Sequence, residues 1–228
     1  MTIHLLRGVY GCAVLNGLYL GIRDTLLIPV LSDDAKIVKS GEEDHGCRDF
    51  VEKVAQELGM KKTIILMRGS RFWSFGCHAF SPKVGMEVNM EKLKSSPLMS
   101  QVWIAHHIAH IQSNDILTWS FVPLVLSIFA VVLLNSRFPY GAPSAGLVMM
   151  GVSYLVIYKW REAQAYRVAF EHCSKEANEA AEKHFEAKVT ANPPLPALSR
   201  WRNFFSQLTQ PSPETLLLYC RARLKAMK

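Results

Sequence analysis

Two neighbouring stretches of the chain, residues 116–134 and residues 138–158, contain no charged residue. Each is long enough to cross the roughly 30 Å hydrocarbon core of a bilayer as one helix. Pro139 and Pro143 favour a turn between them. The sequence therefore predicts a transmembrane helical hairpin over residues 116–158. The alternative is a pair of buried core helices in a soluble protein.

The charges around this hairpin predict its orientation. Lys92 and Lys94 precede it and Lys159 and Arg161 follow it, whereas the turn offers only Arg137. By the positive-inside rule both flanks lie on the same cytoplasmic or matrix side of the membrane. The net charge of +7 over 228 residues suits an anionic bilayer surface. The basic residues are too scattered to indicate a nucleic-acid partner.

The N-terminal segment, residues 1–31, contains a third apolar stretch from Gly8 to Ile22. It is short for a membrane span and rich in glycine, so a membrane anchor and an interfacial helix are both open. No small-residue cleavage site follows it, which favours an uncleaved anchor. Gly17 and Gly21 have the spacing of a helix contact face.

The rest of the chain alternates short structured segments with breakers. Apolar residues at helical spacing predict helices, and short β-branched runs predict strands. The order is helix, two strands, helix, hairpin, long helix and final helix. The predicted helices cover residues 49–58, 99–112, 159–187 and 213–227, the strands cover residues 63–67 and 85–89, and a breaker covers residues 192–196.

The helix that precedes the hairpin carries a histidine motif. His106 and His110 are four residues apart, so a helix places both imidazoles on one face, where both can reach one zinc ion. In the usual His-Glu-x-x-His motif the glutamate handles the proton of the zinc-bound water. Here that position is His107, which lacks the charge of a carboxylate. The alternative is a packed, hydrogen-bonded histidine helix without a metal.

Several motifs occur in a recognisable order around this helix. Together they resemble the membrane-bound zinc metallopeptidases that include the bacterial heat-shock protease HtpX, the CAAX prenyl endopeptidases and the related mitochondrial inner-membrane stress protease. The resemblance covers about residues 48–225. Besides the hairpin, it is carried by Val51-x-x-Val54-Ala55-x-x-Leu58-Gly59, Ala79-Phe80, the stretch His106–Asp115, and Lys159-x-x-Glu162-x-x-Ala165-Tyr166-x-x-Ala169.

The resemblance implies a fold. The expected class is mainly α (α+β): a zincin-like metallopeptidase domain with a small sheet, interrupted by a transmembrane helical hairpin. The first half of that domain would be residues 32–115 and the second half residues 159–228, with the hairpin at residues 116–158 between them.

The resemblance also implies a third zinc ligand. In the family pattern the glutamate that follows the hairpin binds the metal, so Glu162 takes this role beside His106 and His110, and zinc is the cofactor that these three residues could hold. From the residues alone, Glu162 could equally be an interfacial carboxylate paired with Lys159 or Arg161.

Three positions depart from the family pattern at places that carry chemistry. His107 stands at the general-base position, and Tyr166 replaces an aspartate that would support a metal ligand, which argues against tight metal binding. The stretch Thr209-Gln210-Pro211 resembles the family's Thr-His-Pro, which places Gln210 where a histidine is thought to stabilise the oxyanion. The loss of a general base alone removes a rate factor of about 10²–10⁴. These departures favour a proteolytically inactive relative.

Three functions follow as hypotheses. The preferred one is a membrane-anchored pseudopeptidase that serves as a structural or accessory subunit of a membrane complex, with other membrane protein subunits as partners and the mitochondrial inner membrane as its location. The first alternative is an active zinc-dependent metalloendopeptidase. The second is a structural metal-binding module in which His107 joins the ligands and closes the open position that catalysis needs.

Overall fold

A computed structural model of the chain describes residues 2–23, 38, 46–75, 79, 84–191 and 208–228. The described part is mainly helical with one small sheet, as predicted. Phe80, residues 24–31 of the N-terminal segment and the breaker at residues 192–196 lie outside it. The elements are α1 (Thr2–Ile22), α3 (Cys47–Glu57), β1 (Ile64–Gly69), β2 (Trp73–Phe75), β3 (Val84–Asn89), α4 (Met90–Ser95), α5 (Pro97–Gln112), α6 (Asp115–Asn135), α7 (Ala142–His172), α8 (Lys175–Thr190) and α10 (Pro213–Ala226).

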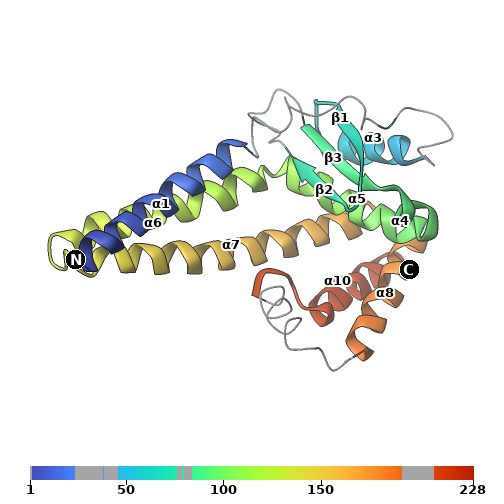
Figure 1. Cartoon of the computed structure of the whole chain (residues 1–228). Helices are drawn as coiled ribbons and strands as arrows, with labels where there is room; N and C mark the ends of the chain where they lie inside the picture. Colours follow the sequence, from blue (N-terminus) through green and yellow to red (C-terminus); the bar gives the residue numbers. More distant parts are fainter. Residues whose placement is uncertain (1, 24–37, 39–45, 76–78, 80–83, 192–207) are drawn as a thin grey trace.

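Three helices are long and apolar enough to cross a membrane: His4–Ile22, Asp115–Asn135 and Ala142–His172. Helices α6 and α7 form the predicted hairpin, and α1 packs against both of them. Figure 1 shows these three helices as a rod that projects from the part of the chain that holds the sheet. The N-terminal segment is therefore a third candidate span beside the hairpin.

Small residues allow α1 to approach the hairpin closely. A Cβ atom added to Gly21 would lie 2.9 Å from Cε2 of Phe121 in α6. One added to Gly17 would lie 3.9 Å from Cδ1 of Leu124, so the predicted contact face of Gly17 and Gly21 is confirmed. On the other side, a Cβ atom on Gly146 of α7 would lie 2.5 Å from Val131 Cγ2 and 2.8 Å from Tyr10 Cε2.

A leucine at Gly146 is expected to destabilise this three-helix bundle, because its side chain would displace both neighbouring helices. Overpacking of this kind costs about 1–3 kcal/mol. Gly151 lies in the same helix with nothing within 4 Å of an added Cβ atom, so Gly151→Leu is the matched control. Thermal unfolding in detergent should show a lower midpoint for Gly146→Leu alone. Equal midpoints for the two variants would contradict the described packing.

Helix α1 runs antiparallel to α6. Gly21 lies against Ser120 near the start of α6, whereas Tyr10 hydrogen-bonds to Ser127, its hydroxyl 3.2 Å from Ser127 Oγ. The N-terminus therefore lies beside the turn between α6 and α7, at the far end of the rod from the sheet (Figure 1).

If all three helices span the membrane, the N-terminus and the C-terminus lie on opposite sides of it. We expect a tag at the N-terminus and a tag at the C-terminus to differ in protease protection in sealed, oriented vesicles. Protection of both tags, or of neither, would show that α1 lies in the interface instead of crossing.

The sheet has the strand order β1-β3-β2. Strand β1 pairs with β3 in parallel and β2 pairs with β3 antiparallel. The strands predicted at residues 63–67 and 85–89 correspond to β1 and β3, whereas β2 lies in an aromatic stretch that had no assigned strand. The core between the sheet and α5 includes Leu66, Met86 and Ile104. Helix α3 lies against β1 and α5 and ends before Gly59, whose φ of +69° suits glycine.

One predicted helix is divided in the structure. The long helix predicted over residues 159–187 is interrupted after α7, because Ser174 caps α8: its Oγ accepts a hydrogen bond from the Ala177 amide at 3.2 Å. Helix α5 ends at Gln112, as predicted, and Asn114, in a left-handed conformation with φ +56°, separates it from α6. Helix α7 continues past the apolar segment and packs against α5, which positions the site described next.

Candidate metal centre

The core of the site is a pair of histidines on α5. His106 and His110 are one turn apart, and their Nε2 atoms lie 3.0 Å from each other. Both side chains are buried, with 4% and 2% of their surface exposed. Helix α5 begins at Pro97, a residue that suits the first helical position, and it is covered by β2, α7 and α8.

Glu162 of α7 completes a group of three. Its Oε2 lies 3.3 Å from His106 Nε2, and its Oε1 lies 3.3 Å from His110 Nε2. Zinc bonds of about 2.0–2.1 Å at tetrahedral angles separate neighbouring ligand atoms by about 3.3 Å. The three side chains are all buried and could hold a metal ion. The structure thus brings together the three residues that the sequence nominated as ligands.

Asp115 and Arg161 orient one of the histidines. His110 Nδ1 donates to Asp115 Oδ2 at 2.7 Å, which leaves Nε2 to face Glu162. The other carboxylate oxygen of Asp115 forms an ion pair with Arg161, and Arg161 Nη2 donates to the Ser113 carbonyl at 2.8 Å. A carboxylate on the far nitrogen of a histidine ligand fixes the tautomer and the ring. Arg161 is therefore engaged by Asp115, which weakens the alternative of a simple Arg161–Glu162 pair.

Sequence reasoning missed this supporting role of Asp115. It took the replacement of an aspartate by Tyr166 as the loss of ligand support. The available signal was the position of Asp115, five residues after His110 and just beyond Asn114. The left-handed turn at Asn114 returns the first residue of α6 to the histidine pair.

His106 has a different environment from His110. Its Nδ1 is buried without a hydrogen-bond partner among the described residues. The ring of Tyr166 lies against it, with 4.0 Å between the two ring centroids. Tyr166 thus orients His106 by packing instead of by a hydrogen bond. The two histidines are held by different means, one polar and one aromatic.

His107 lies outside the group of three. Its Nδ1 is 3.5 Å from Ser74 Oγ on the edge strand β2, at the long limit of a hydrogen bond. Its ring packs edge-on against His106, with 5.1 Å between centroids. His107 therefore points to the sheet, and the described geometry does not place it as a fourth ligand.

Burial and neighbouring charges give the three histidines different pKa values. Burial, followed by the charges of His106 and His110, lowers the pKa of His107 well below its usual range. Burial and His110 also lower the pKa of His106, despite Glu162. Burial alone would lower the pKa of His110 as well, but Asp115 and Glu162 together raise it to about 9. His107 is therefore a neutral imidazole at physiological pH.

Aromatic rings cover the site on the side of the hairpin. The ring of Trp119 in α6 lies 5.2 Å from that of His110. Tyr158 of α7 stacks on Trp119, with centroids 4.8 Å apart. These rings stand between the group of three and the apolar parts of α6 and α7, so the site lies where both helices leave the uncharged segments.

Gln210 lies apart from the buried group. It is exposed, two residues before the Ser212 cap of α10. The stretch Thr209-Gln210-Pro211 thus places a neutral amide at the surface, where it contributes no described contact to His106, His110 or Glu162.

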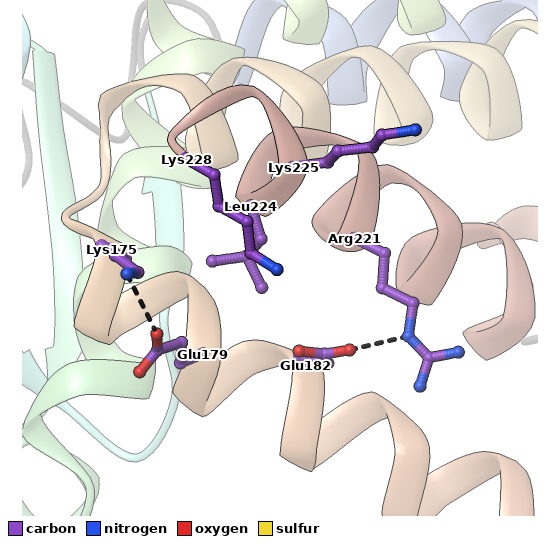
Figure 2. A pocket seen from close by; sticks show the side chains of 7 residues that line it. All are labelled: Lys175, Glu179, Glu182, Arg221, Leu224, Lys225 and Lys228. Atoms are coloured by element: carbon purple, nitrogen blue, oxygen red, sulfur yellow. Dashed lines mark hydrogen bonds and ion pairs between the residues drawn. The ribbon is translucent and has the colours of Figure 1, made fainter.

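Figure 2 shows a surface pocket of about 550 Å³ between α8 and α10. Its charges are largely paired within it: Lys175 lies 4.0 Å from Glu179, and Arg221 lies 2.7 Å from Glu182. Lys225, Lys228 and Leu224 complete its lining. None of the candidate ligands lines it, and its mixed charge indicates no particular ligand class.

Asp115→Asn is expected to weaken zinc binding by about 10–100-fold, because an amide supports a histidine ligand less well than a carboxylate. Zinc titration against a competing chelator would measure this change. Asp49→Asn, at an exposed position in the first turn of α3, is the matched control. An unchanged affinity in Asp115→Asn would show that the contact between Asp115 and His110 does not support a metal ligand.

Comparison with known proteins found no matching family model, curated protein or solved structure.

Proposed function

We propose that this chain is a membrane-anchored pseudopeptidase that binds zinc through His106, His110 and Glu162. It would keep a zincin-like, metallopeptidase-like fold without its proteolytic activity, as a structural or accessory subunit of a membrane complex. The observation that carries the proposal is that the histidines of α5 face different neighbours. The two ligand positions face Glu162 at metal-binding distances, whereas the general-base position, His107, faces Ser74.

The donor set supports zinc as the metal. Two imidazole nitrogens and one carboxylate oxygen are the ligands that many catalytic zinc sites use, with a fourth position left for water. Bound zinc would polarise that water. The chain's own contribution is to bury the site and to hold His110 through Asp115.

The residues around the site support the loss of catalysis. A general base must accept a proton from the water and keep its position during the reaction. His107 is uncharged, its proton affinity is reduced, and a nearby zinc ion would lower it further. Gln210 is exposed and lacks a group that could become cationic. By resemblance to the membrane metallopeptidases, both the base and the oxyanion-stabilising group have been replaced.

Casein hydrolysis tests this part of the proposal. We expect the zinc-loaded wild-type chain and His110→Ala to show the same negligible rate. A robust wild-type rate that His110→Ala abolishes would establish the alternative, an active zinc metalloendopeptidase.

The proposed role as a subunit rests on the membrane helices. Three candidate spans expose large apolar side chains along the rod, among them Phe129, Val132 and Val148. Lipid covers such a surface in a free protein, and other membrane subunits cover it in a complex. We propose the mitochondrial inner membrane as the location, by resemblance to the inner-membrane member of the family.

Native electrophoresis of membranes that contain the tagged chain tests the role as a subunit. Migration with a larger assembly that survives mild detergent is the expected result, and organelle fractionation would check the location. Migration solely as a free monomer would refute the role as a subunit. That result would not bear on the zinc site or on the loss of proteolysis, which the other experiments test.

A further inference from the structure

A groove lies between α7 and the beginning of α10, and the described residues that line it belong to these two helices and to Pro211 before α10. Its volume of about 360 Å³ falls in the range of small-ligand sites. The lining residues are spaced three and four apart, so each helix contributes one face. Helix α7 supplies Val156, Lys159, Trp160 and Ala163, and α10 supplies Thr215 and Tyr219.

The groove crosses the level at which α7 leaves its apolar segment. Val156 belongs to the uncharged stretch that ends at Tyr158, and Lys159 is the first charged residue after it. The start of α6 lies at the same level, because Asp115 forms an ion pair with Arg161. One end of the groove therefore lies against the hydrocarbon of a bilayer, and the other lies among the headgroups.

The chemistry of the groove changes along its length in the same direction. Its end nearest the uncharged stretch is apolar, with the exposed Val156 and the buried Pro211. Trp160 is 55% exposed, and exposed tryptophans are typical of the membrane–water interface. Among the described lining residues there is one lysine and no acidic residue.

A second cation lies at the polar end. The Arg167 guanidinium donates from Nη2 to the Tyr219 hydroxyl at 3.0 Å and covers the Tyr219 ring at 4.3 Å from its centroid. Arg167 is two turns beyond Trp160 on α7. The polar end of the groove therefore has positive charge at Lys159 and Arg167, with hydroxyl groups at Thr215 and Tyr219.

We propose that this groove binds an anionic phospholipid of the surrounding bilayer. An acyl chain lies along Val156 and Pro211, and the phosphate lies near Lys159, on the side of the groove that leads to Arg167. This site is separate from the zinc ligands, so it stands or falls independently of the proposed function. It does require α7 to cross the membrane.

Native mass spectrometry of the full-length chain tests the proposal. The protein is reconstituted into nanodiscs that contain equal amounts of phosphatidylcholine and phosphatidylglycerol, then released in mild detergent. We expect the wild type to retain phosphatidylglycerol in preference to phosphatidylcholine. Thr215→Trp, which fills the groove, should lose the retained lipid. Leu218→Trp is the matched control, because Leu218 is 67% exposed on α10 and does not line the groove.

Two further readouts keep the test decisive. Lys159→Gln should reduce the preference for phosphatidylglycerol about fivefold, the effect of removing one cation near an anionic lipid. If Thr215→Trp fails to fold, brominated phosphatidylglycerol should quench the fluorescence of the wild type more than that of Trp160→Phe. Equal retention of the two lipids, or equal retention by the wild type and a folded Thr215→Trp, would overturn the proposal.

Discussion

Zinc is expected to raise the melting temperature of the metal-free wild-type chain by about 10 °C and that of His110→Ala not at all. A ligand present at about a thousand times its dissociation constant stabilises the folded state by about 4 kcal/mol. Glu162 contacts His106 and His110 from the neighbouring helix α7. A metal ion would replace these contacts with bonds that join α5 to α7.

His107→Ala is the matched control for this experiment. It removes the histidine next to His106 on the same helix, but one that points to Ser74 and lies outside the group of three. Its zinc response should equal that of the wild type. The comparison uses the response to zinc, because His110→Ala also removes the hydrogen bond to the buried Asp115 Oδ2 and lowers stability by itself. A lost response in His107→Ala would support the metal-binding module in which His107 is a ligand.

His107→Glu is expected to create zinc-dependent hydrolysis of casein, with a rate about 100-fold above that of the wild type. The glutamate side chain can rotate away from Ser74, so its carboxylate would reach the ligand side and accept the proton of a water held by bound zinc. The wild-type imidazole at this position contacts Ser74 and has a lowered pKa. The change therefore supplies a general base, the group whose absence best explains the proposed loss of catalysis.

The double variant His107→Glu, His110→Ala is the control for this gain. It carries the new carboxylate without the second imidazole, so it should be inactive. His107→Glu with Gln210→His would show whether the exposed Gln210 position can also contribute. If the zinc-loaded single and combined variants are both inactive, the missing base does not account for the loss of catalysis, and the resemblance to the metallopeptidases fails at the site.

Local patterns predicted those parts of the structure that depend on near neighbours in the chain. The spacing of His106 and His110 on one helix needs no tertiary contact, and neither does the uncharged length of the two hairpin segments. The stop at Gly59 and the contact face of Gly17 and Gly21 also follow from single residues. These features are present in the described structure.

Features that depend on distant segments were harder to predict. The contact of Arg161 with Asp115 joins residues 46 positions apart. It forms because α7 runs back along α6 and brings Arg161 next to Asp115, the first residue of α6. Strand β2 has three residues, too few for an alternating pattern to be visible. The break at Ser174 is a cap inside an alanine- and glutamate-rich stretch, where helix propensity favours continuation.

The role of Glu162 depended both on its neighbours in the chain and on residues far from it in the sequence. From the residues alone it was one acidic side chain beside Lys159 and Arg161, and the resemblance supplied its expected role. The structure places it opposite two histidines, with 5% of its surface exposed. A buried carboxylate at this place is stabilised by the cationic or metal partner that it faces.

Zinc K-edge X-ray absorption of the purified wild-type chain tests whether His106, His110 and Glu162 hold zinc. We expect bound zinc with nitrogen and oxygen neighbours at about 2.0–2.1 Å and the outer-shell pattern of two imidazoles. His110→Ala should lose this spectrum. A first shell of sulfur at about 2.3 Å, or a wild-type chain that takes up no more zinc than His110→Ala, would contradict it.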